Sequence, residues 1–154
     1  MRWNQGREAI DGLIAEGFIQ RVAPSREHAD LLIVQAHAHL SSAQKICADD
    51  PAGGYAMTYD AARKALTAVL ENHGLRPTTR GGHLAVYQAV RAQLSPPLGE
   101  VLAPFDRMRR QRHDVEYPPV DAPALTETDV REDLPKATAI VQMAGQVLDG
   151  MSPY

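Results

Sequence analysis

Residues 105–118 read FDRMRRQRHDVEYP and lie in a segment, 98–117, whose apolar residues recur every three or four positions. This spacing is typical of a helix with one apolar face. The residues on that face are Leu98, Val101, Phe105, Met108 and Val115. The place between Met108 and Val115 holds Arg112. Since burying an unpaired guanidinium costs several kcal/mol, we expect Arg112 to reach an edge, pair with carboxylates or face a polar cleft.

The charged residues of this segment also follow helical spacing. Four pairs stand four residues apart: Asp106 and Arg110, Arg110 and Asp114, Arg109 and His113, and Arg112 and Glu116. For Arg110 we predict a solvated row of ion pairs, each worth roughly 0.3–0.5 kcal/mol. For Arg109 and His113, a solvated face and a functional site both remain open. Arg112 is the exception, because it stands among the apolar residues.

Helical spacing runs through most of the remaining chain, where alanine and leucine are frequent and alternating β-branched runs are missing. Ser25 is a candidate N-cap, Asp50-Pro51 a helix start, and Gly74 a C-terminal stop. Helices are therefore predicted over 4–16, 25–49, 51–73, 83–94, 98–117 and 126–148. Pro104 must begin or kink the helix within 98–117. These elements predict an all-α fold, an antiparallel bundle of five to six helices.

Composition limits the class of protein. The 154 residues fit one domain, 1–154, with an N-terminal helix and linker over 1–24 and a bundle core over 25–148. The net charge of −3 excludes a generally cationic nucleic-acid coat, so any basic patch must be local. We find no membrane span and no secretory leader, and we expect a cytoplasmic protein. The single cysteine, Cys47, excludes an internal disulfide and a cysteine-based zinc site.

Other polar residues give weaker signals. His37 and His39 stand two apart on a predicted helix, so they point in nearly opposite directions and cannot share a metal ion. His73, near a helix end, is predicted at the surface. His83 opens a helix after two glycines, where backbone amides suit an anion, but this feature is generic. Tyr59 is predicted to belong to the core.

The segment 105–118 resembles the signature helix of HEPN domains. The resemblance extends to residues 59–65, 73–77 and 81–83, which read YDAARKA, HGLRP and GGH, and it covers about residues 25–148. The chain is similar to small actinobacterial-type HEPN proteins and to the HEPN half of HEPN/MNT toxin–antitoxin pairs. The resemblance implies a HEPN-like helical bundle that forms a homodimer, in which the two signature helices line a shared cleft.

Active HEPN ribonucleases share an arginine, a polar residue, three variable residues and a histidine, and they act without a metal ion. On this pattern Arg112 matches the arginine, His113 falls on the polar position and Tyr117 falls where the histidine is expected. These three are the catalytic candidates that the resemblance implies. Tyrosine has a reference pKa near 10, which makes it a poor base at neutral pH. Arg107 and His113 match a looser spacing, but six helical steps separate them by about 120°.

Two functions stay open. In the first, the arginine-rich helix binds RNA or a nucleotide in the dimer cleft, as a metal-independent ribonuclease or a toxin component with a nucleotidyltransferase antitoxin as partner. Arg107, Arg109 and Arg112 would then contact phosphate, supported by Asp106 and Glu116. In the second, the protein is a non-catalytic interaction module whose arginine cluster is structural or binds a protein partner. Neither function predicts a cofactor or a bound metal ion.

Overall fold

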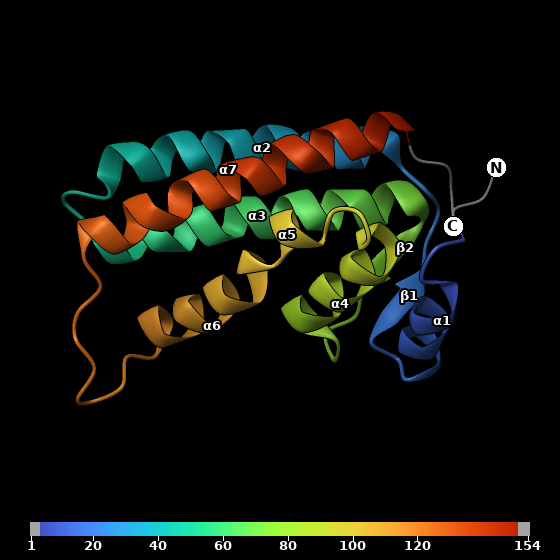
Figure 1. The fold of residues 1–154 in the computed structure, drawn as a ribbon, viewed down its shortest axis with the longest axis horizontal. Helices are drawn as coiled ribbons and strands as arrows, with labels where there is room; N and C mark the ends of the chain where they lie inside the picture. Colours follow the sequence, from blue (N-terminus) through green and yellow to red (C-terminus); the bar gives the residue numbers. More distant parts are fainter. Residues whose placement is uncertain (1–3, 151–154) are drawn as a thin grey trace.

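The computed structural model describes residues 4–150, so residues 1–3 and 151–154 of the predicted domain lie outside the described part. Three long helices lie side by side and form the body of the fold (Figure 1). They are α2 (Arg26–Ile46), α3 (Pro51–His73) and α7 (Glu127–Gly150). The helices α4 (Gly82–Leu94) and α6 (Pro104–Glu116) pack against α3. The prediction of an all-α helical bundle is confirmed.

Shorter elements lie around α4. Helix α1 (Arg7–Ala15) packs on α4, and the single turn α5 (Gly99–Leu102) leads into α6. Two strands, β1 (Ile19–Arg21) and β2 (Leu75–Pro77), pair antiparallel. The sequence did not indicate them, because three residues are too few for a visible alternation. Within residues 4–150, no helix is both long and apolar enough to cross a membrane.

Capping residues explain the ends of the long helices. The Ser25 hydroxyl accepts a hydrogen bond from the His28 backbone N–H at 3.1 Å and starts α2. The Asp50 carboxylate does the same for the Gly53 N–H at 2.9 Å, ahead of Pro51 in the first turn of α3. Gly74, at φ 84°, ends α3 in the left-handed conformation. These three predicted boundaries are confirmed.

The last residue of α3, His73, does not lie at the surface as predicted. It is buried, and its Nδ1 lies 2.8 Å from Oε1 of Gln93 on α4. Burial lowers the pKa of His73. The prediction was wrong because α4 covers this end of α3, a contact that the local sequence does not reveal.

The predicted helix 98–117 is divided at Ala103, and α6 begins with Pro104. Proline suits the first turn of a helix, where its missing N–H has no helical partner. One turn of α6 then buries Phe105 and Met108 completely. The Phe105 ring stacks on Tyr59 of α3 at a centroid distance of 5.3 Å and on Tyr87 of α4 at 5.7 Å. These contacts fix which face of α6 meets the bundle.

Candidate functional site

Arg112 lies on the same face of α6 as Met108, one turn further on, and it reaches the edge of the bundle. Its Cζ lies 5.9 Å from the centroid of the Tyr59 ring, and its Nη2 lies 3.1 Å from Oε1 of Glu116. The side chain is 28% exposed. Two of the arrangements expected for Arg112 are therefore present together, namely an edge position and a carboxylate partner. A cation–π contact with Tyr59 adds to them.

Below Arg112, Tyr59 connects α3 to the first turn of α4. The Tyr59 hydroxyl lies 2.9 Å from Nδ1 of His83, and the two ring centroids are 5.6 Å apart. Burial raises the pKa of Tyr59 above its ordinary value, although neighbouring arginines oppose the shift. The phenol therefore stays protonated at neutral pH. Since it occupies Nδ1 of His83, only Nε2 is left to contact another group.

Arg63 stands one turn after Tyr59 on α3 and brings a second guanidinium to this place. Its side chain is 25% exposed, and its Nε lies 3.5 Å from Oδ1 of Asp60. The Nε atoms of Arg63 and Arg112 are both buried without a hydrogen-bond partner. An unsatisfied buried donor costs roughly 1–3 kcal/mol, so these two donors, on arginines whose charges both act on Tyr59, call for an explanation.

His83 lies among positively charged side chains. Burial lowers the pKa of His83 below its ordinary value, and the positive charges of Arg63, Arg112 and Arg109 lower it further. The imidazole is therefore neutral at neutral pH. We call Tyr59, Arg63, His83 and Arg112 the arginine–histidine site. Tyr59 contacts both His83 and Arg112, and the Arg63 charge acts on His83.

Arg109 borders the arginine–histidine site, and Asp106 holds it in place. The Arg109 Nε donates to Oδ1 of Asp106 at 3.0 Å, and its Nη2 lies 2.9 Å from the same oxygen. The Arg109 charge acts on His83 and on Tyr59. Arg110 also lies near Asp106, at 3.5 Å, but its side chain is 67% exposed. The predicted solvated ion pair between Arg110 and Asp106 is present.

Arg107 points elsewhere, toward α7. Its Nη1 and Nη2 donate to the two carboxylate oxygens of Asp133 at 3.1 and 2.6 Å, and the Tyr55 hydroxyl donates to the same carboxylate at 2.7 Å. Burial alone would raise the pKa of Asp133, but the hydrogen bonds from Arg107 and Tyr55 outweigh it and hold this pKa below its usual value. Arg107 therefore links α6 to α7 and does not join Arg112.

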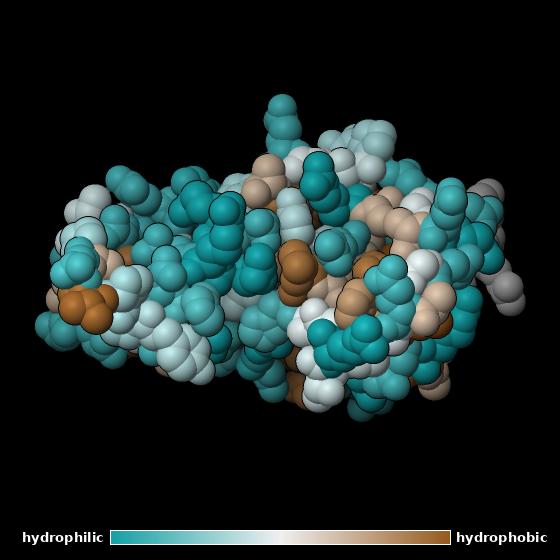
Figure 2. Space-filling model, turned by 90° about the horizontal axis from the view of Figure 1, so that it is seen from below, coloured by the Kyte–Doolittle hydropathy of each residue, from teal (hydrophilic) through white to brown (hydrophobic). Residues whose placement is uncertain are grey.

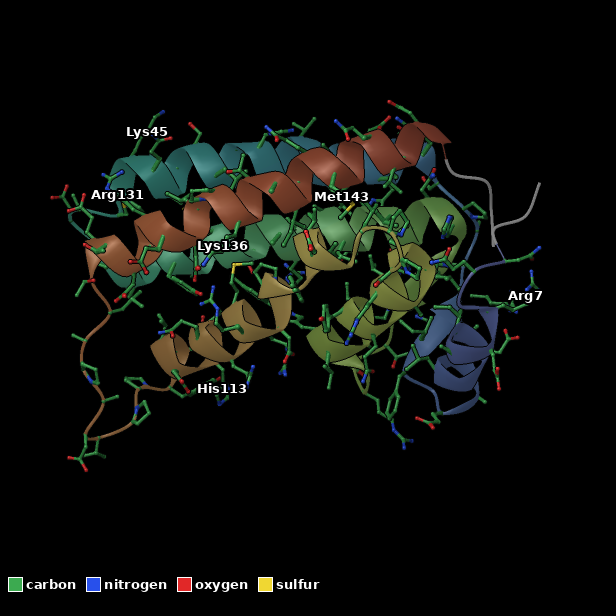
Figure 3. The ribbon with its side chains drawn as sticks, in the orientation of Figure 1. Arg7, Lys45, His113, Arg131, Lys136 and Met143 are labelled. Carbon is green, nitrogen blue, oxygen red and sulfur yellow. The ribbon has the colours of Figure 1, made fainter. Side chains whose placement is uncertain are left out.

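The other two catalytic candidates lie at the end of α6. His113 is exposed on the side of the helix away from α3 (Figure 3). Its ring lies 5.1 Å from that of Tyr117, which is 68% exposed and ends the helix just before Pro118. Within residues 4–150, the hydrogen bonds and ring contacts join these two to each other and not to Arg112. The three catalytic candidates thus form two separate groups.

Sequence reasoning missed Arg63 and His83 as partners of Arg112, although both lie in the segments that carry the resemblance. The signal that could have found His83 is the pair of glycines before it. A Cβ atom at Gly81 would collide with the carbonyl oxygen of Phe18, so the close approach of this turn requires glycine. That turn fixes the start of α4 and with it the position of His83.

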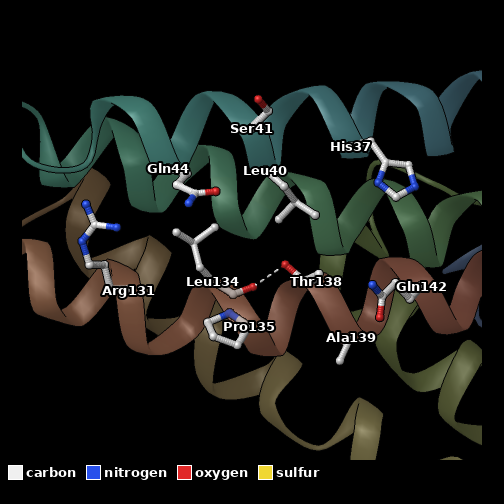
Figure 4. Close-up of a pocket in the computed structure, with 10 residues that line it drawn as sticks. All are labelled: His37, Leu40, Ser41, Gln44, Arg131, Leu134, Pro135, Thr138, Ala139 and Gln142. Carbon is white, nitrogen blue, oxygen red and sulfur yellow. Dashed lines mark hydrogen bonds between the residues drawn. The ribbon is translucent and has the colours of Figure 1, made fainter.

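Two hollows lie outside the arginine–histidine site. A groove of about 580 Å³ runs between α2 and α7, lined by polar residues such as His37 and Arg131 (Figure 4). A second, of about 610 Å³, lies between the α2–α3 turn and the loop after α6. The surface over α6 is mainly hydrophilic (Figure 2). Among residues 4–150, no group of three histidine, cysteine or acidic side chains is arranged to hold a metal ion.

We then compared the chain with known proteins. The family profile of the HEPN domain matches residues 29–147, a range that contains α3, α4, α6 and the whole arginine–histidine site. Searches of curated proteins and of solved structures gave no significant match.

Proposed function

The chain belongs to the HEPN domain family, and on this premise we propose that it binds RNA or a nucleotide through phosphate held at the arginine–histidine site. The observation that carries the proposal is the pair of guanidinium groups of Arg63 and Arg112, whose side chains are partly exposed and whose buried Nε–H groups make no hydrogen bond. Guanidinium N–H groups bind phosphate oxygens strongly, and the exposed part of each of these two side chains is open to a phosphate group. His83 lies beside them and offers Nε2 as a further polar contact.

The carboxylates around the site support this proposal and do not compete with it. Asp106 and Glu116 each hold one edge of an arginine, Arg109 and Arg112 respectively. A fixed guanidinium loses less conformational entropy when it binds a ligand. We therefore propose for Asp106 and Glu116 the supporting role in phosphate binding that the sequence analysis expects of them.

We place this site in the cleft of a homodimer, as the family resemblance implies. The largely hydrophilic surface over α6 suits a cleft that stays open to a charged ligand (Figure 2). Light scattering on the purified protein should then give twice the mass of one chain. A mass of one chain at all concentrations would reject the dimer and leave the phosphate site to be tested alone.

The phosphate site is tested by fluorescence anisotropy with a labelled single-stranded RNA at fixed salt. Arg112→Ala and Arg63→Ala should each weaken binding by about tenfold or more, the size expected for a charged hydrogen bond. Arg110→Ala is the matched control, because Arg110 lies on the same helix and is largely solvated. Loss of affinity with Arg110→Ala but not with Arg112→Ala would overturn the proposal.

RNA cleavage is the finer part of the proposal, with Arg112, His113 and Tyr117 as the candidates. We propose testing it by incubating the wild type and Arg112→Ala with RNA in EDTA. Cleavage by the wild type alone would establish a metal-independent ribonuclease. Intact RNA in both reactions, with binding retained, would assign the non-catalytic interaction module. In that case the pairing of His113 with Tyr117 is a structural contact at the helix end.

A toxin role would require a partner, for which the resemblance suggests a nucleotidyltransferase. The exposure of Tyr117 supports this proposal, since its hydroxyl is accessible to a modifying enzyme. Incubation with a candidate nucleotidyltransferase and ATP, followed by mass spectrometry, should give a nucleotide adduct on Tyr117. An adduct on a different residue, or none, would argue against this partner.

A further inference from the structure

Lys64 is a cation held in place without a carboxylate. It follows Arg63 on α3, and its Nζ donates to Oε1 of Gln35 at 3.0 Å and to Nε2 of His39 at 2.9 Å, both on α2. Burial and the Lys64 charge lower the pKa of His39, so this histidine is a neutral acceptor at neutral pH. Within residues 4–150, no acidic side chain forms an ion pair with Lys64. Neither bonded partner of Lys64 therefore carries a negative charge.

Two neutral partners also fix the position of this ammonium group. A surface lysine ordinarily moves among many rotamers and loses that freedom when it binds. Here Gln35 and His39 hold the Lys64 amine in advance, while its third N–H remains for a ligand. Lys64 is thus prepared to contact an anion, and the function proposed above does not use it.

Arg63 connects Lys64 with the arginine–histidine site. The Arg63 charge acts on His39, beside Lys64, and also on His83, beside Arg112. Arg63 and Lys64 follow each other on α3, and both side chains are partly exposed there, as is that of Asp60 one turn earlier. The acidic residue that acts on both histidines is Asp60, which is paired with Arg63. A row of cations consequently runs from α6 across α3 to the edge of α2.

We propose that Lys64 makes a second phosphate contact, so that the ligand is a single strand of RNA several nucleotides long that crosses α3. A nucleoside monophosphate carries a single phosphate group, which can make one of these two contacts and not both. A phosphodiester backbone carries a charge at every nucleotide and can follow a row of cations. This inference rests on the proposed function, since it extends the same site.

The test compares two ligands, a dinucleotide and a single-stranded RNA of about ten nucleotides. Lys64→Met should weaken binding of the longer RNA by about five- to tenfold and leave dinucleotide binding unchanged. It should also reduce the slope of log affinity against log salt by about 0.7, the value for one lost phosphate contact on a single strand. Lys64→Arg, which keeps the charge, should retain most of the affinity for the longer RNA.

Lys45→Met is the matched control, because Lys45 is an exposed lysine on α2 away from this row. Thermal melting of each variant shows whether it is folded. Wild-type affinity for the longer RNA in Lys64→Met, or equal wild-type affinities for both ligands, would overturn the inference. If Arg112→Ala binds both ligands as the wild type does, or if the wild type binds neither, the proposed function fails and this inference fails with it.

Discussion

The hydroxyl of Tyr59 lies 2.9 Å from Nδ1 of His83, and this hydrogen bond joins α3 to the first turn of α4 beside Arg112. The sequence analysis assigned Tyr59 to the core and regarded the anion-binding feature at His83 as generic, so neither was predicted as a site residue. Tyr59 is fully buried and packs on Phe105, so a single ring supports both the core and the site above it. The position of His83 therefore depends on the packing of α6.

The pKa of His83 should respond to Arg112. Burial and the surrounding arginines hold this pKa below the ordinary value near 6.5. Arg112→Ala removes one positive charge, so protonation becomes easier and the pKa of His83 should rise. An NMR titration of the His83 ring measures the change, with Arg110→Ala as the control that leaves it unchanged. An unchanged pKa of His83 in Arg112→Ala would show that the Arg112 charge does not act on the imidazole.

Tyr59→Phe should remove the hydrogen bond to His83 and keep the ring stacked between Phe105 and Arg112. The free energy of unfolding should fall by about 0.5–1.5 kcal/mol, the net value of one such bond. Affinity for RNA should fall less than with Arg112→Ala, because the phenyl ring still supports the guanidinium. Urea unfolding and anisotropy measure the two effects. A loss of affinity larger than that of Arg112→Ala would mean that the hydroxyl itself contacts the ligand.

Asp133→Asn should destabilise the protein in a pH-dependent manner. Arg107 and Tyr55 lower the pKa of Asp133 in the folded state. The ionised carboxylate therefore stabilises the fold fully at pH values well above its unfolded pKa of about 4. This stabilisation is lost as the pH falls through the lower pKa of the folded state. At pH 7 we expect Asp133→Asn to lower the free energy of unfolding by roughly 1–3 kcal/mol. This range allows for solvent screening of the ion pair, because Arg107 is half exposed.

Urea unfolding of wild type and Asp133→Asn at pH 7 and at acidic pH checks this prediction. Asp149→Asn is the control, because Asp149 pairs with Arg26 at an exposed position and should lower the free energy of unfolding much less than Asp133→Asn does. The difference between wild type and Asp133→Asn should shrink as the pH falls below about 4. A difference that grows on acidification would contradict the linkage of Asp133 to Arg107.

Much of the fold was predictable, because local signals set the helix ends. Ser25, Asp50 and Gly74 act within a few residues of themselves, and the structure uses all three as the sequence indicated. The charged Arg112 among apolar residues also predicted that its side chain reaches an edge, a carboxylate or a polar cleft. Contacts between distant segments gave no such signal. The partner of Arg107 is Asp133 on α7, which no helical spacing within 98–117 can reveal.

The site was predictable only in part, for the same reason. The sequence located Arg112, Arg109 and their carboxylates on one helix, where i, i+3 and i, i+4 spacing brings side chains together. Arg63 and His83 join them through the packing of α3 and α4 against α6. His113 stands next to Arg112 in the sequence, yet the helix turns it to the side away from α3.

RNA phosphate should bind between Arg63 and Arg112, and NMR of the arginine Nε–H groups during titration with a short single-stranded RNA measures this contact. We predict that the Nε–H signals of Arg63 and Arg112 shift with saturation, while that of Arg131, which pairs with Glu127 on α7, stays in place. Saturable RNA binding that leaves the Arg63 and Arg112 signals unmoved would exclude phosphate binding at these two arginines.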